Sequence, residues 1–253
     1  MIQLENVTKI LGERRILDGV NLAIRKGETM VIVGPSGTGK SVTLKHMVRL
    51  MTPDEGRVVV DGQIISDAAG KALEQLRDKF GVLFQGGALL EWLNVGENVA
   101  LPLREKTRLT EDEIQARVLE KLSMVGLEKD MEKFPSEISG GMRKRVGLAR
   151  AIVTNPEIIL YDEPTSGLDP VSSRMIDRLI EQLRKELGVT SVVVTHDLHS
   201  ALSIGTRIAM LTRGRIVELA EPADFVKSQQ EDVQQFLESQ FITIRGEWEK
   251  NGL

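Results

Sequence analysis

Gly34-Pro35-Ser36-Gly37-Thr38-Gly39-Lys40-Ser41 matches, at every fixed position, a glycine-rich loop that joins a strand to a helix. The apolar run Thr29–Val33 precedes this loop, and residues 41–50 have the amphipathic pattern of a helix. Strand, glycine-rich loop and helix in this order predict the phosphate-binding core of an α/β protein.

The chemistry expected of this loop is the binding of nucleotide phosphates. Its glycines let backbone N–H groups turn toward phosphate oxygens, and the N-terminus of the next helix adds partial positive charge. We expect Lys40 to reach the β- and γ-phosphates of ATP and the hydroxyl of Ser41 to ligate Mg²⁺. The alternative, a turn that binds nothing, is disfavoured because both pattern and context match. The predicted ATP contacts are Gly34, Pro35, Ser36, Gly37, Thr38, Gly39, Lys40, Ser41 and Val42.

The bulk composition is that of an ordinary folded domain. The 253 residues carry a net charge of -4 and contain no cysteine, which argues against nucleic-acid binding and excludes disulfides and thiolate metal sites. No apolar run approaches the ~20 residues that cross a bilayer, and residues 1–5 lack a signal-peptide pattern. We therefore expect the chain to stay on the side where it is made and to reach a membrane only through a partner.

The order of apolar runs predicts an α/β P-loop NTPase core with an N-terminal antiparallel β-subdomain and an inserted helical lobe. Asp61-Gly62 predicts a hairpin, and Thr110 with Glu113 predicts a capping box at the start of a helix over 110–125. Strand, helix and strand over 158–195 predict a right-handed crossover in a parallel sheet. The strands are expected at residues 16–24, 29–33, 57–60, 80–84, 158–161, 191–195, 207–212 and 215–219. The predicted division is 1–85 with 156–225 for the core, 86–155 for the lobe and 226–253 for a C-terminal extension.

Two acidic residues end the apolar run 158–161. A carboxylate at the end of a buried strand lies where such folds hold their ligand, so we expect Asp162 to complete Mg²⁺ coordination. Glu163 is expected to orient the attacking water or accept its proton. An acidic turn that only ends a strand is the alternative for the pair taken alone.

With four further elements in order, the sequence resembles the ABC ATPase family from Ile2 to about Phe225. Gln85 resembles the glutamine that senses Mg²⁺ and couples to a membrane partner. Ser139-Gly140-Gly141 resembles the family signature, Ser166-Gly167-Leu168-Asp169 the loop that crosses the dimer interface, and His196 the switch histidine at the γ-phosphate. The catalytic residues that this resemblance implies are Glu163, His196, Lys40 and Gln85, and the implied metal ligands are Ser41, Gln85 and Asp162.

The signature segment also predicts a dimer. Ser139 with two glycines before a helix is a second anion site, distant along the chain from the first, so one ATP can contact both only if two copies pair. A simple helix cap is the alternative. We expect Ser139, Gly140, Gly141 and Asp169 of one copy to approach the ATP of the other.

The sequence departs from the family pattern at three places. Ile138 and Met142 replace the usual leucine and glutamine of the signature, while the serine and glycines that should touch phosphate remain. The aromatic residue that commonly stacks on adenine is missing, and Leu11 stands about where it would be. We therefore expect apolar contact from Leu11 to replace stacking.

At a finer level the chain resembles the ATPases of MCE-linked, Mla-type phospholipid transport systems, on residues 84–89, 98–105 and 139–145. This resemblance implies integral membrane permease subunits, an MCE-domain lipid-binding protein, no nucleic acid, and a location on the cytoplasmic face of the inner membrane. The apolar segment 86–95 is expected to form a groove for a short helix of the permease. For Trp92 within it, ordinary lobe core remains an equal alternative.

Two further questions stay open at the level of sequence. Residues 226–253 carry Phe236, Leu237, Phe241, Ile242 and Trp248, and we expect them to pack on the second ATPase subunit or on the partner, a partly ordered terminus being the alternative. The rival functions are the ATPase of an amino-acid or lipoprotein transporter, a non-transport ABC protein acting on ribosomes or DNA, and a nucleotide-dependent regulator. A single cassette without a basic patch disfavours the ribosome or DNA alternative.

Overall fold

The computed structural model describes residues 1–240, which form two compact units. The first unit joins residues 1–73 to the segment that begins at Val192, and the second comprises residues 74–191. The domain boundaries expected from the sequence, at residues 86 and 156, remain a prediction. Within residues 1–240 no helix combines the length and the apolar character needed to cross a bilayer.

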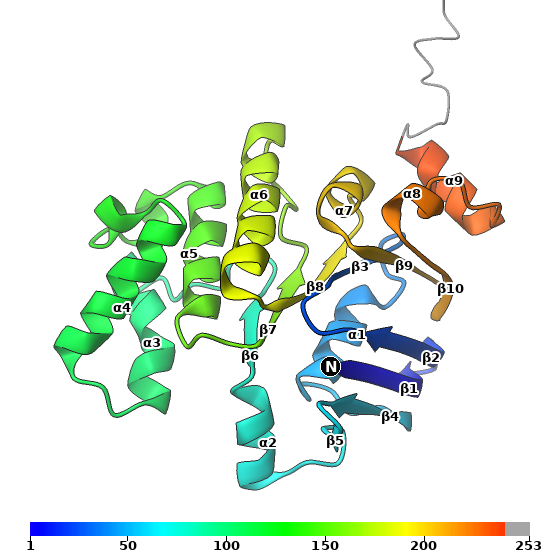
Figure 1. Ribbon diagram of the computed structural model, residues 1–253, viewed down its shortest axis with the longest axis horizontal. Coiled ribbons are helices and arrows are strands. Elements are labelled where there is room, and N and C mark those ends of the chain that lie inside the picture. The colour runs from blue at the N-terminus through cyan, green and yellow to red at the C-terminus, as the bar shows by residue number, and fades with distance from the viewer. Residues whose placement is uncertain (241–253) are drawn as a thin grey trace, which may run out of the picture. The chain divides into compact units, whose positions relative to one another are not determined.

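The first unit contains an antiparallel sheet near the start of the chain (dark blue to cyan in Figure 1) with the strand order β2-β1-β4-β5. The hairpin predicted at Asp61-Gly62 is confirmed, because Val60 pairs with Gln63 and the two turn residues have φ of +49° and +78°. Strand β1 was not predicted, since its pairing with β2 is interrupted by register shifts that break the alternation of buried residues. The strands are β1 (Ile2–Leu11), β2 (Arg14–Ile24), β4 (Glu55–Val60) and β5 (Gln63–Ile64).

The same unit holds a second group of strands in the order β10-β9-β3-β8. β3 is buried along its whole length and pairs in parallel with β9, which fits the continuous apolar run that the sequence shows there. The strands are β3 (Thr29–Val33), β8 (Thr190–Thr195, which starts in the second unit), β9 (Arg207–Thr212) and β10 (Arg215–Ala220). The helices are α1 (Lys40–Met47), α7 (Leu198–Ile204), α8 (Pro222–Phe225) and α9 (Glu231–Ser239), and α1 corresponds to the helix expected over 41–50.

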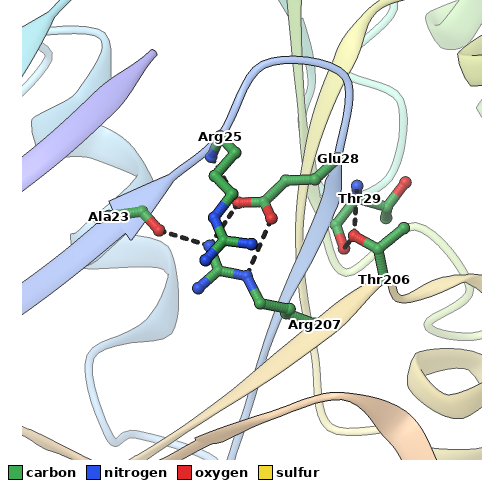
Figure 2. A network of polar contacts seen from close by, with 6 residues as sticks. All are labelled: Ala23, Arg25, Glu28, Thr29, Thr206 and Arg207. Atoms are coloured by element: carbon green, nitrogen blue, oxygen red, sulfur yellow. Dashed lines mark hydrogen bonds and ion pairs between the residues drawn. The ribbon is translucent and has the colours of Figure 1, made fainter.

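An ion pair between Glu28 and Arg207 connects the segment before β3 to the start of β9, as Figure 2 shows. The guanidinium of Arg207, at the start of β9, donates to both carboxylate oxygens of Glu28 at 2.9 and 2.7 Å and to the carbonyl of Ala23 in β2 at 2.7 Å. The backbone N–H of Arg25 also donates to Glu28, at 2.6 Å. Because both charged side chains are largely buried, the pair depends on these hydrogen bonds.

The second unit consists of strands β6 and β7, which pair in parallel, and of helices that include the predicted lobe. Helices α3, α4 and α5 pack on one another, in green in Figure 1. The capping box of α4 is confirmed, with the side chains of Thr110 and Glu113 each bonding the other's backbone N–H. The elements are α2 (Gly70–Arg77, which starts in the first unit), β6 (Phe80–Leu83), α3 (Val95–Lys106), α4 (Glu111–Met124), η1 (Glu128–Asp130), η2 (Pro135–Glu137), α5 (Gly140–Ile152), β7 (Ile158–Asp162) and α6 (Pro170–Leu187).

The C-terminal segment partly corrects the expectation from the sequence. Phe236 and Leu237 of α9 are buried within the chain itself, together with Val233, so they need no second subunit to cover them. Phe241, Ile242 and Trp248 lie outside the described residues.

Candidate active site

The phosphate loop, residues 34–41, connects β3 to α1 in the first unit, and its shape requires glycine at two positions. Gly34 has φ of +149°, and a Cβ there would lie 2.1 Å from the carbonyl oxygen of Leu211. Gly39 has φ of +102°, and its Cβ would lie 2.8 Å from Cδ2 of Leu17. The loop is therefore built against β9 on one side and β2 on the other.

Lys40 is buried at the centre of this loop. Its ammonium donates to the carbonyl oxygens of Gly34 at 2.8 Å and Pro35 at 2.9 Å, and the hydroxyl of Thr38 donates to the Pro35 carbonyl at 3.0 Å. A cation held inside a curve of backbone at a helix N-terminus has the charge and geometry that suit phosphate oxygens. Ser41 follows in the first turn of α1 and is half-buried, as is Val42.

His196 also lies in the first unit, directly after β8. Its side chain is exposed, while the backbone on either side is fixed. The N–H of Asp197 donates to the hydroxyl of Thr195 at 3.0 Å, and the Asp197 carboxylate caps α7 by accepting from the Ser200 N–H at 3.1 Å. Leu11, the expected adenine contact, is 43% exposed at the end of β1.

The acidic pair lies in the second unit, where β7 ends at Asp162. Glu163 is half-buried and has φ of +50°, which is unusual for a residue with a side chain. Downstream, Asp169 caps α6 by accepting from the N–H groups of Val171 at 2.9 Å and Ser172 at 3.0 Å. Hydrogen bonds from Ser172, and then from Val171, lower the pKa of the Asp169 carboxyl, so it stays ionised at the helix N-terminus.

The signature segment forms the exposed N-terminus of α5 in the same unit. The hydroxyl of Ser139 accepts from the N–H of Met142 at 3.2 Å, so the alternative of a helix cap is part of what Ser139 does. Beyond the backbone of α5 itself, a Cβ added to Gly140 or Gly141 would meet no atom of residues 1–240 closer than 3.4 Å. The chain itself therefore does not require glycine here, and the bare helix end leaves room for another molecule.

Gln85 is exposed two residues beyond the end of β6, and the turn after it is anchored by a residue that the sequence analysis did not name. Arg150 of α5 donates to the carbonyl oxygens of Gly87 at 2.7 Å and Ala88 at 2.9 Å. Lys144 of α5, which lies in the segment 139–145 but had no role assigned to it from the sequence, donates to the carbonyl of Glu163 at 3.2 Å. The signal available in the sequence was a basic residue on the inward-facing side of a helix, where Lys144 is buried and Arg150 is half-buried.

A groove with a volume of 380 Å³ opens in the second unit beside this turn. Its lining comes from β6, the following turn, α3 and the end of α5: Phe80, Gly81, Val82, Phe84, Ala88, Leu101, Pro102, Glu105, Lys106, Arg150, Ala151 and Thr154. Trp92 is 73% exposed, so the alternative that it belongs to the core of the lobe is wrong.

The expected Mg²⁺ ligands contain a single carboxylate, that of Asp162. No cluster of three or more metal-binding His, Cys, Asp or Glu side chains occurs within residues 1–240. A hydroxyl, an amide and one carboxylate suit Mg²⁺ that is also bound by substrate phosphates, because this ion rarely sits in an all-protein cage. The donor set therefore fits Mg²⁺ delivered with ATP.

A model of a family described as ABC transporter matches residues 17–166, which include the phosphate loop, Gln85, the signature segment and the acidic pair. The chain belongs to the ABC transporter family. Its strand pattern and its likeness to solved cassettes show the ABC ATPase fold. One of these, the ATP-binding cassette MJ0796, solved as a dimer bound to ADP and Pi, is 40% identical with a TM-score of 0.81, covering 88% of this chain and 99% of that one. CbiO1 from Clostridium perfringens is 29% identical with a TM-score of 0.82, covering 94% of each chain.

Several curated members of the ABC transporter family resemble the chain over most of its length. The probable ribonucleotide transport ATP-binding protein mkl of Mycobacterium bovis is 45% identical over 95% of this chain and 67% of that protein. The intermembrane phospholipid transport system ATP-binding protein MlaF of Haemophilus influenzae is 39% identical over 95% of this chain and 91% of MlaF. The methionine import ATP-binding protein MetN 1 of Pectobacterium atrosepticum is 42% identical over 87% of this chain and 66% of that protein. The chain is therefore an ABC transporter ATPase that hydrolyses ATP.

Proposed function

We propose that this ABC ATPase powers the movement of phospholipids between membranes in an MCE-linked complex. The observation that supports this most is the similarity to MlaF, which extends over nearly the whole of both chains. The segments 84–89, 98–105 and 139–145, which carry the Mla-type resemblance, lie at the groove and at the signature helix α5. A second candidate, import of an amino acid, is favoured by the 42% identity to MetN 1.

For the chemical step, we propose that the phosphate loop of the first unit and the acidic pair of the second act on one nucleotide. Lys40 binds the β- and γ-phosphates, Glu163 orients the attacking water and accepts its proton, and His196 donates a hydrogen bond to the γ-phosphate. Mg²⁺, held by Ser41, Asp162 and Gln85, would neutralise charge that develops on the phosphates. Gln85 also couples the state of the Mg²⁺ site to the membrane partner. Val42 and the remaining loop residues position the phosphates, and Leu11 contacts adenine.

We propose that the working form is a homodimer with two ATP molecules between the copies. Ser139, Gly140 and Gly141 of one copy, with its Asp169, approach the ATP bound by the other. Two observations support this. The N-terminus of α5 has free space around Gly140 and Gly141, and the structure of the similar cassette MJ0796 is a dimer bound to ADP and Pi.

The proposed membrane partner is a permease whose short cytoplasmic helix enters the groove of the second unit. Phe84 and Leu101 offer it apolar contact, and Glu105 and Arg150 offer charged groups at the same groove. Docking there would place the chain on the cytoplasmic face of the inner membrane. An MCE-domain protein would complete the complex on the lipid side.

The test uses Glu163→Gln, which keeps size and removes the base. We expect this variant to lose about 100-fold or more in kcat while it still binds ATP and gains a stable dimer in its presence. Glu186→Gln, the same change at an exposed position at the far end of α6, is the control and should leave kcat unchanged.

The Glu163→Gln chain is then affinity-purified with ATP from its native membranes in mild detergent. A permease with an MCE-domain protein and bound phospholipid would support the lipid function. A permease with an amino-acid-binding protein would favour the second candidate. Recovery of ribosomes or DNA alone would contradict transport, and full turnover of the variant would refute the role of Glu163.

A further inference from the structure

Lys144, on α5, is a buried lysine whose charged end lies against backbone. Only 4% of the residue is exposed. Its ammonium donates hydrogen bonds to the carbonyl oxygen of Glu163, at 3.2 Å, and to that of Ser166. A lysine ammonium carries three donors and is strongly hydrated, so burial against two carbonyls is tolerated only because those hydrogen bonds form. They fix the position of the side chain.

Both carbonyls belong to the turn that follows β7. Within this turn the N–H of Ser166 donates to the Glu163 carbonyl at 3.2 Å, and the N–H of Leu168 donates to that of Thr165 at 3.2 Å. Glu163 has φ of +50°, a conformation that costs a residue with a side chain about 1–3 kcal/mol and persists only where the surroundings hold it. Lys144 binds the turn from a different element and bridges its two ends.

The helix that supplies Lys144 also supplies the signature segment. Ser139 caps α5, and Lys144 follows five residues later, about 7.5 Å along the helix axis. The lysine therefore connects the exposed helix end to the residue proposed as the catalytic base, within one unit of one chain.

We propose that Lys144 is a positioning residue for ATP hydrolysis, which holds the Glu163 turn in a fixed place against the signature helix. The inference rests on the proposed role of Glu163. Its physical basis is that a carboxylate about 1 Å out of place can cost about 100-fold in rate. A lysine that only stabilised the fold would lower the stability of the unit without changing turnover by the folded protein.

The experiment compares kcat and KM for ATP hydrolysis by the full chain and its variants. Lys144→Met keeps the aliphatic part of the side chain and removes every donor, whereas Lys144→Gln keeps N–H donors. Both replacement side chains are one atom shorter than lysine, so the two variants differ in donors and not in length. The matched control is Lys121→Met, which removes a buried ammonium from α4 where it pairs with Glu120 at 2.7 Å. Glu163→Gln is measured alongside, and urea unfolding of each variant shows that it is folded.

We expect Lys144→Met to lower kcat by about 30- to 100-fold with KM within about threefold of the wild-type value, because the site still binds ATP but the base is misplaced. Lys144→Gln should recover part of this, to about three- to tenfold below wild type, because its amide can still bond one carbonyl. Lys121→Met should stay within about twofold of wild type.

Three results would overturn the inference: a kcat for folded Lys144→Met within about threefold of wild type, an equal loss in Lys121→Met, or no recovery with glutamine. If Lys144→Met does not fold, Lys144→Gln alone tests the proposal. A wild-type kcat in that variant contradicts the proposal, and a reduced kcat at unchanged KM supports it. An active Glu163→Gln variant would instead refute the proposed function, and the inference with it. An inactive Glu163→Gln beside fully active Lys144 variants would remove only the inference.

Discussion

Replacing Gly34 with alanine tests how tightly the phosphate loop is built. The new Cβ would lie 2.1 Å from the carbonyl oxygen of Leu211, whereas a close carbon–oxygen contact is about 3.3 Å, so the two must separate by about 1.2 Å. β9 cannot easily yield, because Met210 pairs with Val33 in the parallel sheet next to Leu211. The loop must move instead, and it carries Lys40 with it.

A shift of this size should lower kcat/KM for ATP by about 100-fold and the free energy of unfolding by about 1–3 kcal/mol. The assay is steady-state ATP hydrolysis with urea unfolding of the same samples. Gly37→Ala is the control, since its Cβ would meet no atom of residues 1–240 within 4 Å and its φ of +81° is what opposes the change. We expect a loss below about tenfold there, from about 1–2 kcal/mol of backbone strain. Equal losses in the two variants, or wild-type activity of Gly34→Ala, would refute the steric reasoning.

Two further predictions concern stability. Arg207→Met should lower the free energy of unfolding, measured by urea titration, by about 3 kcal/mol, because it leaves the buried Glu28 carboxylate without its charged partner. The control, Arg213→Met, breaks an exposed ion pair and should lower it by less than about 1 kcal/mol. Equal losses in the two variants would contradict this prediction. Burial lowers the pKa of Lys144 from 10.5 to about 8, while the Glu163 charge opposes the shift. Between these values the unfolded chain keeps a proton that the folded chain has lost, so this group makes the protein more stable as pH rises. The free energy of unfolding of the wild type, relative to that of Lys144→Met, should therefore be larger at a pH of about 9.5 than at about 7.5. A difference that does not change with pH would contradict the lowered pKa of Lys144. The measurements stay below the ordinary pKa of tyrosine. Burial raises the pKa of Tyr161, and above the ordinary value this group would make the protein less stable as pH rises.

Sequence predicted the elements whose signals are local. The strand before the phosphate loop is a continuous apolar run, and the hairpin at Asp61-Gly62 and the capping box at Thr110 depend on residues at most three positions apart. These features arise from backbone sterics and short-range hydrogen bonds, which a single sequence encodes directly.

The missed elements depend on contacts between distant segments. β1 pairs with both β2 and β4 through register shifts, so its buried residues do not alternate in a regular pattern. α7 is only seven residues long, and its cap, Asp197, directly follows His196, for which the sequence was interpreted as a nucleotide contact and not as the start of a helix. Contacts with other segments, strand pairing for β1 and packing on β3 for α7, therefore add to a weak local signal.

The candidate site shows the same division. The phosphate loop, the acidic pair and the signature segment were found by pattern, because their chemistry requires fixed residue types at fixed spacing. The contacts that shape the phosphate loop could not be found by pattern. Gly39 lies against Ile16 and Leu17, and Gly34 lies against Leu211. These are ordinary residues whose role becomes visible only when strands far apart in the sequence meet.

Lys144 and Arg150 extend this argument to the working of the second unit. From one helix, α5, they bond the backbone of two turns, the one that follows β7 and the one that follows Gln85. Moving α5 against either turn would break side-chain hydrogen bonds from charged donors, each worth about 1.5–3 kcal/mol. Because Arg150 also lines the groove, a partner helix that shifts α5 from there must carry the Glu163 turn with it or break the Lys144 contacts. We therefore expect α5 and the two turns to move as one body, so that Lys144 connects the groove to Glu163, the proposed base, in addition to the connection proposed for Gln85.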